Sequence, residues 1–422
     1  MSDLANAPPP NPFRPGNGQK PVYLAGRDKE QQQFESMVLD STVAQNLIVT
    51  GLRGVGKTVL LEELKPIAQR RDWLWTGNDL SESASLTEDR IARRIVVDLS
   101  TLVAPMFVRK NTIHKPGFTA TGEVTETNVG FDDFWNLYEK TPGLVDDKLK
   151  AVLTEARRLL EQTNVRGVIF AYDEAQNLSD HAVAKEYPLS ILLDVFAYFQ
   201  RHRSKCNFML VLTGLPTLYP KLNEARTYSE RMFHTMYLNR LDQDDARAAI
   251  VKPIELTKST LRFSKETIER ILKNSNGYPY FIQFICKEVF DAWIAKMTYG
   301  EVPSVNMQSI VAKLDQDFFS PRWSRATDRQ QDFMKVVATL ENSDEEFSVQ
   351  EIVGVSRVLL KKGFTPSHAT QILQALAEKG LMYKSRRGGY CFAVPLLSRF
   401  IKRQVWNPEA LKNQNSDGDD AL

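Results

Sequence analysis

The chain has 422 residues, with 54 Lys and Arg, 52 Asp and Glu, and a formal net charge of +2 at pH 7. This length excludes a single ordinary hydrophobic core, so we expect two or three domains. No apolar run approaches the roughly 18 residues that span a bilayer, and the N-terminus lacks a signal-peptide core, so we expect a cytoplasmic protein without a membrane partner. Cys206, Cys286 and Cys391 form no C-x-x-C motif, which argues against a disulfide framework and a zinc site.

Residues 1–22 are rich in Pro, Asn and Gly, and we expect a flexible, extended leader that packs little of its own surface. From residue 23 to 241, strand-like apolar runs alternate with amphipathic helical windows, which favours a parallel sheet with helices on both faces. An alternation of polar and β-branched residues around Gly122, within 105–143, predicts a β-hairpin insertion to which we assign no task. The apolar runs are 47–50, 73–75, 168–172, 208–213 and 236–238.

A phosphate-loop motif follows the first of these runs. Residues 51–58, Gly-Leu-Arg-Gly-Val-Gly-Lys-Thr, fit G-x-x-x-x-G-K-[ST] and precede a helix-like stretch. In this context, backbone N–H groups and the helix N-terminus point at nucleotide phosphates, Lys57 reaches the β and γ oxygens, and Thr58 ligates Mg²⁺. A glycine turn with a surface lysine is the simpler alternative, but it leaves Thr58 and the strand unexplained. The predicted contact residues are Gly51, Gly54, Val55, Gly56, Lys57, Thr58 and Val59.

Two carboxylates follow the run 168–172. Asp173 is predicted to hold magnesium near Thr58, and Glu174 to polarise the water that attacks the γ-phosphate. A solvated acidic pair that caps the next helix is the alternative. Thr213 ends the next apolar run and would face the same phosphate if the two strands are neighbours. A hydroxyl that bonds its own turn explains Thr213 equally well.

The end of this domain and the region after it carry fewer chemical signals. Arg231 is a candidate to reach the nucleotide of a neighbouring subunit, Arg226 competes with it, and a surface salt bridge is the alternative for either. Residues 242–318 show helical patterns, so we predict a helical lid domain. In this domain, Gly277-Tyr278-Pro279 begins a strongly amphipathic helix.

Residues 319–405 predict a winged helix, and a polar, acidic tail follows at 406–422. Two helices precede a third that starts at Thr365-Pro366 and stops at Gly380, and two short strands follow. Residues 321–403 hold 14 Lys and Arg against 8 Asp and Glu, so this module is basic.

The winged helix has two interpretations. On duplex DNA, its third helix would enter the major groove while basic side chains hold phosphates, and these are Lys361, Lys362, Lys384, Arg386 and Arg387. The alternative is a protein-docking or autoinhibitory module. Leu373, Leu376 and Leu381 are expected in the core under both interpretations.

These motifs together resemble those of AAA+ ATPases, and more narrowly the bacterial branch between origin-recognition-type initiators, transposition ATPases and STAND-type ATPases. The resemblance rests on 51–58, Asp173-Glu174, the Ala25-Gly26-Arg27-x-x-Glu30 box and the Gly277-x-Pro279 turn, followed by the winged helix. It implies an α/β P-loop fold, ATP or ADP with Mg²⁺, adenine recognition near Arg27, hydrolysis by Glu174, sensing at Thr213 and a trans contact from Arg231.

The lid departs from the common AAA+ pattern. Many AAA+ proteins have an arginine at the start of a lid helix, whereas this chain has Gly277-Tyr278-Pro279-Tyr280. That turn resembles STAND-type switches, in which Pro279 would help hold the nucleotide in a resting state.

Our first interpretation is an ATP hydrolase whose nucleotide state controls a homo-oligomer, formed with ATP, and its binding to duplex DNA or to a partner effector or recombinase-type protein. A STAND-type signalling ATPase is the alternative, and a nucleotide-locked scaffold is the third.

Overall fold

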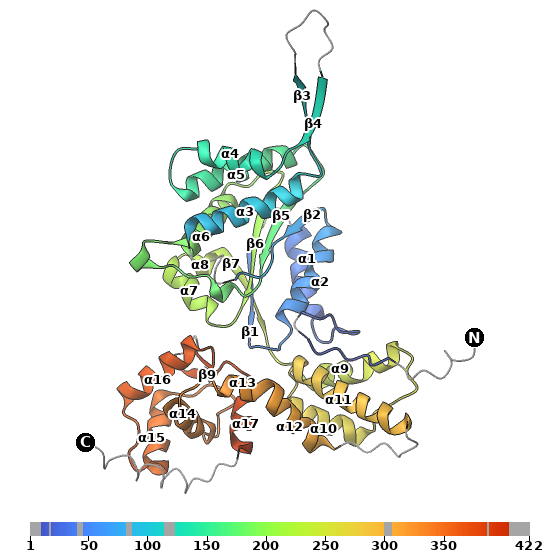
Figure 1. The fold of residues 1–422 in the computed structure, drawn as a ribbon, viewed down its shortest axis with the longest axis vertical. Helices are drawn as coiled ribbons and strands as arrows, with labels where there is room; N and C mark the ends of the chain where they lie inside the picture. Colours follow the sequence, from blue (N-terminus) through green and yellow to red (C-terminus); the bar gives the residue numbers. More distant parts are fainter. Residues whose placement is uncertain are drawn as a thin grey trace, which may run out of the picture. The chain divides into compact units, whose positions relative to one another are not determined.

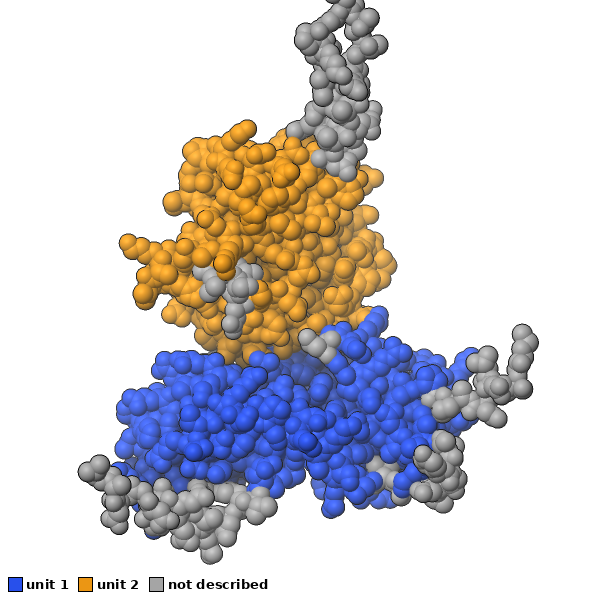
Figure 2. All heavy atoms as spheres, in the orientation of Figure 1, with its two compact units in different colours: residues 1–27, 51–56, 238–422 blue, residues 28–50, 57–237 orange. Residues whose placement is uncertain are grey.

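The computed structural model of the protein describes residues 10–16, 18–39, 45–81, 87–113, 123–298, 306–385 and 388–404. The chain divides into two compact units, which Figure 2 distinguishes by colour. Unit 1 contains residues 1–27, 51–56 and 238–422, and unit 2 contains residues 28–50 and 57–237. Each unit is described by itself below.

Unit 2 is built around a sheet of five strands in the order β2-β5-β6-β1-β7. Adjacent strands pair in parallel from β2 through β5 and β6 to β1. β1, β5 and β6 are buried along their whole length, because a parallel sheet with helices on both faces buries both sets of side chains. The predicted parallel sheet is therefore confirmed. The strands are β1 (Asn46–Gly51), β2 (Trp73–Thr76), β5 (Gly167–Tyr172), β6 (Asn207–Gly214) and β7 (Phe233–Leu238).

Helices cover both faces of this sheet (Figure 1). On one face, Phe34 of α1 packs edge-on against Trp75 of β2. On the other, Phe196 of α6 packs against Phe170 and belongs to a core shared with α3 and α5. The helices are α1 (Asp28–Leu39), α2 (Lys57–Gln69), α3 (Glu88–Val103), α4 (Phe131–Lys140), α5 (Val145–Leu160), α6 (Pro188–Arg201), α7 (Leu218–Ala225) and α8 (Ser229–Met232).

Successive side chains at the carboxyl end of β5 point to opposite faces of the sheet. The Tyr172 hydroxyl donates to Asp98 Oδ2 of α3 at 3.0 Å, and Arg94 Nε donates to the same oxygen at 2.9 Å. Burial raises the pKa of Asp98, although Arg94 and Tyr172 act to lower it. Because successive strand residues point to opposite faces, Asp173 lies on the face away from α3, toward α2.

The predicted hairpin insertion is present between α3 and α4. Strands β3 (Val108–Ile113) and β4 (Glu123–Asn128) pair antiparallel, with Ile113 opposite Glu123. The part of the predicted alternation from 117 to 122 lies outside the described residues.

Unit 1 is mainly helical, and its C-terminal part has the predicted order of three helices and a hairpin. The hydroxyl of Thr365 accepts the His368 N–H at 3.3 Å and so caps the third helix, as the sequence predicted. The final helix, α17, was not predicted. The elements are α9 (Gln243–Leu256), α10 (Lys265–Ser275), α11 (Pro279–Thr298), α12 (Met307–Leu314), η6 (Asp315–Phe319), α13 (Ser320–Trp323), α14 (Asp328–Ala338), α15 (Val349–Leu359), α16 (Pro366–Glu378), β8 (Met382–Lys384), β9 (Tyr390–Phe392) and α17 (Leu397–Arg403).

The lid and the C-terminal module share one hydrophobic core. We predicted a boundary between residues 318 and 319, but both phenylalanines there are buried. Phe318 packs edge-on against Phe281 of the lid at 5.1 Å between ring centroids, and Phe319 stacks on Phe400 of α17 at 5.3 Å. The π-helix η6 thus joins the two modules through aromatic contacts, at the point where a domain boundary was expected.

The leader also differs from its expectation in the part that the structure describes. Phe13 is 1% exposed and stacks on Phe263 in unit 1. Asn11 Nδ2 donates to Asp291 Oδ1 at 2.7 Å, and the Arg14 N–H donates to Gln283 Oε1 at 3.1 Å. The described part of the leader therefore packs on unit 1 through Phe13, although the average composition of residues 1–22 predicted little packing.

Across the ranges given above, no helix is long and apolar enough to cross a membrane.

Candidate functional site

The end of β5 and the start of α2 bring the two predicted magnesium ligands together in unit 2. The Thr58 hydroxyl donates to Asp173 Oδ2 at 2.5 Å, although 115 positions separate the two residues in the sequence. The Glu174 N–H donates to Asp173 Oδ1 at 2.7 Å. Asp173 is 3% exposed and Lys57 is 8% exposed, so two opposite charges are buried at this edge of the sheet.

The electrostatics at Asp173 fit a divalent cation. Burial raises the pKa of Asp173, and the negative charge of Glu174 adds to this rise. The hydrogen bonds from Thr58 and the Glu174 N–H oppose the rise, as does the positive charge of Lys57. A hydroxyl and a carboxylate are the oxygen ligands that Mg²⁺ prefers, usually together with waters and substrate phosphates. Within the described ranges, no group of three or more His, Cys, Asp or Glu side chains could hold a metal ion.

The raised pKa of Asp173 predicts a stability change. A carboxyl group whose folded pKa lies above its ordinary value of 3.8 favours the fold below that value, and this contribution is lost as the pH rises through the folded pKa. At neutral pH the ionised group therefore destabilises the nucleotide-free protein. We expect Asp173→Asn, in EDTA, to raise the midpoint of thermal unfolding at pH 7, because the amide removes the buried charge.

The difference between Asp173→Asn and wild type should shrink when unfolding is followed below pH 3.8, because the carboxyl group is then largely protonated in both the folded and the unfolded state. Glu62→Gln is the matched control, because Glu62 is exposed in the middle of α2 and its substitution should leave the midpoint unchanged. A lower midpoint for Asp173→Asn at pH 7 would contradict the electrostatic argument.

Glu174 adopts a backbone conformation that is uncommon for a side-chain-bearing residue. Its φ is +51°, in the left-handed region, and such strain often occurs at functional sites. Its carboxylate oxygen Oε2 accepts a hydrogen bond from Gln176 Nε2. Sequence reasoning missed Gln176, because a glutamine two residues after a carboxylate carries no recognised signal.

Thr213 lies at the end of β6, and β6 pairs with β5, which is the condition under which we expected Thr213 to face the same phosphate. Its side chain is 0% exposed, and within the described ranges its hydroxyl has no hydrogen-bond partner. The alternative in which this hydroxyl bonds its own turn is therefore not seen. Thr50, which the sequence analysis did not single out, has a similarly unpaired buried hydroxyl at the end of β1. Buried hydroxyls are usually paired, so Thr213 fits the predicted contact with a phosphate.

Residues 51–56 of the phosphate loop belong to unit 1. Gly54 and Gly56 have φ of +76° and +90°, a region that favours glycine. The Gly54 carbonyl accepts the Tyr280 N–H at 3.1 Å, directly after Pro279 at the start of α11. The lid turn therefore contacts the backbone of the loop.

Arg27 supports the loop from a second direction. Arg27 is 5% exposed. Its guanidinium donates to the carbonyls of Val55 at 3.0 Å and Asn239 at 2.7 Å. In this arrangement Arg27 acts on the loop backbone, and its predicted contact with the nucleotide stays a prediction.

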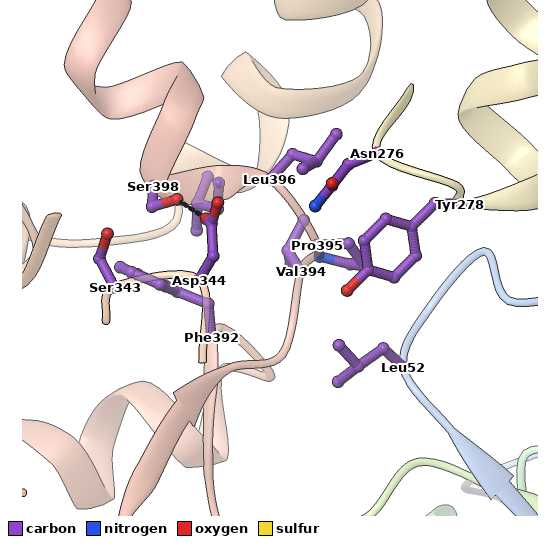
Figure 3. Close-up of a pocket in the computed structure, with 11 residues that line it drawn as sticks. Leu52, Asn276, Tyr278, Ser343, Asp344, Phe392, Val394, Pro395, Leu396 and Ser398 are labelled. Carbon is purple, nitrogen blue, oxygen red and sulfur yellow. Dashed lines mark hydrogen bonds between the residues drawn. The ribbon is translucent and has the colours of Figure 1, made fainter. Parts of the chain in front are cut away.

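The C-terminal module also lies close to the loop. Leu52 and Tyr278 line a small pocket together with Val394, Pro395 and Leu396, and Figure 3 shows Leu52 and Tyr278 facing that segment. Arg53 Nη2 lies 3.8 Å from the position that a Cβ would occupy at Gly380.

Comparisons with known proteins agree with this geometry. Residues 41–222 match the family model of an AAA domain, a range that includes Lys57, Thr58, Asp173, Glu174 and Thr213. Residues 41–222 are an AAA domain. Residues 316–401 match a domain of unknown function (DUF8462), and no curated protein matches the chain.

Several solved structures resemble the chain at low sequence identity. The ORC2 protein of Aeropyrum pernix, in ADPNP–ADP complexes, is 13% identical, with 92% of this chain and 96% of that chain covered and a TM-score of 0.52. The Aeropyrum pernix ORC1 protein in complex with DNA is 13% identical, with 91% and 94% covered and a TM-score of 0.41. The Thermotoga maritima RuvB Holliday junction branch migration motor is 12% identical, with 87% and 92% covered and a TM-score of 0.40. The family match and the ORC2 likeness confirm the predicted AAA+ P-loop fold with a helical lid.

The two candidate trans arginines, just after the matched AAA domain, differ in their surroundings. Arg226 donates to both carboxylate oxygens of Asp194, at 2.9 and 2.5 Å, and to Ser190 Oγ at 2.8 Å. Burial alone would raise the pKa of Asp194, but the hydrogen bonds from Arg226 and Tyr228 lower it. Arg226 is thus engaged within its own unit. Arg231 is exposed on α8 and stays the candidate for a trans contact.

Only three of the five residues predicted to contact DNA lie in the described ranges. Lys361 and Lys362 are exposed in the turn after α15, and Lys384 is exposed at the end of β8. Arg386 and Arg387 lie outside the described residues. Leu373, Leu376 and Leu381 are buried, as both interpretations of the module require.

Proposed function

We propose that the chain binds ATP with Mg²⁺ and hydrolyses it. The observation that carries this proposal is the hydrogen bond between Thr58 and Asp173, because it joins the end of the phosphate-loop motif to the carboxylate that follows β5. The similarity in fold to the ORC2 protein, which was solved with ADPNP and ADP, supports an adenine nucleotide as the ligand.

The residues of the AAA domain have distinct tasks in this proposal. Lys57 and the loop N–H groups bind the phosphates, and Thr58 and Asp173 would hold Mg²⁺. When bound, the metal supplies positive charge to the β and γ oxygens. The Glu174 carboxylate orients the attacking water and withdraws its proton, while the Thr213 hydroxyl contacts the γ-phosphate.

Calorimetry on nucleotide-free protein tests the binding step. We expect ATP and ADP to bind with magnesium and more weakly in EDTA. Absence of affinity for either nucleotide in the presence of magnesium would overturn the proposal.

We further propose that the nucleotide state is coupled to a homo-oligomer and to duplex DNA through the C-terminal module. Three exposed lysines, Lys361, Lys362 and Lys384, support this, because exposed cations on the turn and the wing suit phosphate contacts. Light scattering with ATP and with ADP, with and without duplex, measures the assembly.

Salt dependence tests the DNA contact separately. If Lys361 and Lys362 each contact a phosphate, replacing both by Ala should reduce the slope of log affinity against log salt by roughly 2. Lys252→Ala is the matched control, because Lys252 is exposed on α9 and pairs with Glu255. Unchanged binding in the double variant would remove these lysines from the contact.

A second candidate is a signalling switch in which the C-terminal module senses the nucleotide. The proximity of Leu52 and Arg53 to the module favours it, because a shift of the loop would then be felt by the neighbouring segment. In that case ADP stays bound through purification, turnover is negligible, and duplex does not bind in any nucleotide state. Recruitment of an effector or recombinase-type partner remains compatible with either candidate.

A further inference from the structure

We propose that Gln176 is a positioning residue that fixes the Glu174 carboxylate relative to the end of β6. The inference rests on the proposed ATP hydrolysis, since it assigns Gln176 a task in the same site. No role for Gln176 followed from the sequence motifs.

The two ends of the Gln176 amide bridge two neighbouring strand ends. Gln176 lies in the short helix η4 (Ala175–Asn177), just after β5. Its Oε1 accepts the Leu215 N–H at 3.0 Å, and Leu215 follows directly on β6. Its Nε2 donates to Glu174 Oε2. A backbone N–H can only donate, so the Leu215 contact determines which end of the amide faces the carboxylate.

The surroundings hold the amide in this orientation. Lys221 Nζ donates to the Gln176 carbonyl at 2.6 Å and to Ser179 Oγ at 2.8 Å, which fixes the backbone of η4. Burial lowers the pKa of Lys221. A Cβ at Gly214 would lie 2.7 Å from Gln176 Oε1, so the absence of a side chain there leaves room for the amide.

This bridge matters because a carboxylate that orients water must be held in one geometry. A glutamate side chain loses conformational freedom when it is fixed. The hydrogen bond from Gln176 imposes this loss before the reaction begins. The bridge also connects Glu174 to the segment that carries Thr213. A displacement at the end of β6 would therefore move the carboxylate.

Two substitutions test the proposal in steady-state ATP hydrolysis by the full chain. Gln176→Ala removes both contacts, and we expect kcat to fall about tenfold, while KM and calorimetric ATP affinity change less than about twofold. Gln176→Glu keeps an acceptor for Leu215 but places a second carboxylate beside Glu174, so kcat should fall at least as far. This near-isosteric variant carries the test if Gln176→Ala does not fold.

A double-mutant cycle separates positioning from general structure. If Gln176 acts through Glu174, then Gln176→Ala should cause no further loss of turnover in a Glu174→Gln background. Asn177→Ala is the matched control, because it removes a neighbouring side-chain amide that donates to the Leu80 carbonyl at 2.9 Å. The bond from the Asn177 N–H to the Glu174 carbonyl, at 2.9 Å, belongs to the backbone and is kept in this variant. Its kcat should stay within about twofold of wild type.

Three results would overturn the inference: an equal loss in the Glu174→Gln background, an equal loss for Asn177→Ala, or a raised KM at unchanged kcat. Failure of the proposed function looks different. Undiminished turnover in Glu174→Gln removes the base and the inference together. Full turnover in both Gln176 variants, with turnover lost in Glu174→Gln, removes the inference alone.

Discussion

Glu174→Gln is expected to retain ATP binding and to reduce turnover by about a hundredfold or more. The substituted amide has the size and shape of the carboxylate, so the phosphate loop and the Thr58–Asp173 contact stay intact. The amide cannot take a proton from water, so the chemical step alone loses its base. Phosphate release under saturating ATP measures turnover, and calorimetry measures affinity.

The matched control for that experiment is Glu62→Gln. Glu62 is exposed on α2, in the same unit as Glu174, so its substitution should leave both turnover and affinity unchanged. Undiminished turnover in Glu174→Gln would remove Glu174 from the proposed role. Loss of ATP affinity in that variant would assign Glu174 to binding.

The sequence predicted those parts of the fold and site that depend on local patterns. Continuous apolar runs marked the strands because a covered parallel sheet buries both faces of each strand. The prediction that Thr58 and Asp173 lie close together was correct. A phosphate loop after one strand and a carboxylate after another meet at the same edge of a parallel sheet.

The features that were missed depend on contacts between distant segments. Gln176 gains its task from Leu215, 39 positions away, and neither residue carries a motif. Phe13 docks on Phe263, so the average composition of the leader concealed its anchor. The core shared by the lid and the C-terminal module passes through Phe318 and Phe319, at a point where sequence periodicity suggested only a boundary.

Gly54→Ala is expected to weaken ATP affinity by about 10- to 100-fold. The φ of +76° at Gly54 is strained for alanine, at roughly 1–3 kcal/mol, and a Cβ there would lie 2.9 Å from Tyr280 Cβ. Neither atom sits at the end of a flexible side chain, so the loop must shift. That shift would disturb the bond from the Tyr280 N–H to the Gly54 carbonyl, and with it the loop N–H groups that we propose bind the phosphates.

Gly354→Ala separates this local strain from the general effect of replacing a glycine. Gly354 lies inside α15 with no atom within 4 Å of an added Cβ, and alanine favours a helix over glycine by roughly 1 kcal/mol. We therefore expect unchanged ATP affinity and equal or higher thermal stability in that variant. Calorimetry on both proteins decides the matter: if Gly54→Ala binds ATP as tightly as Gly354→Ala does, the left-handed turn at Gly54 is not required for the nucleotide site.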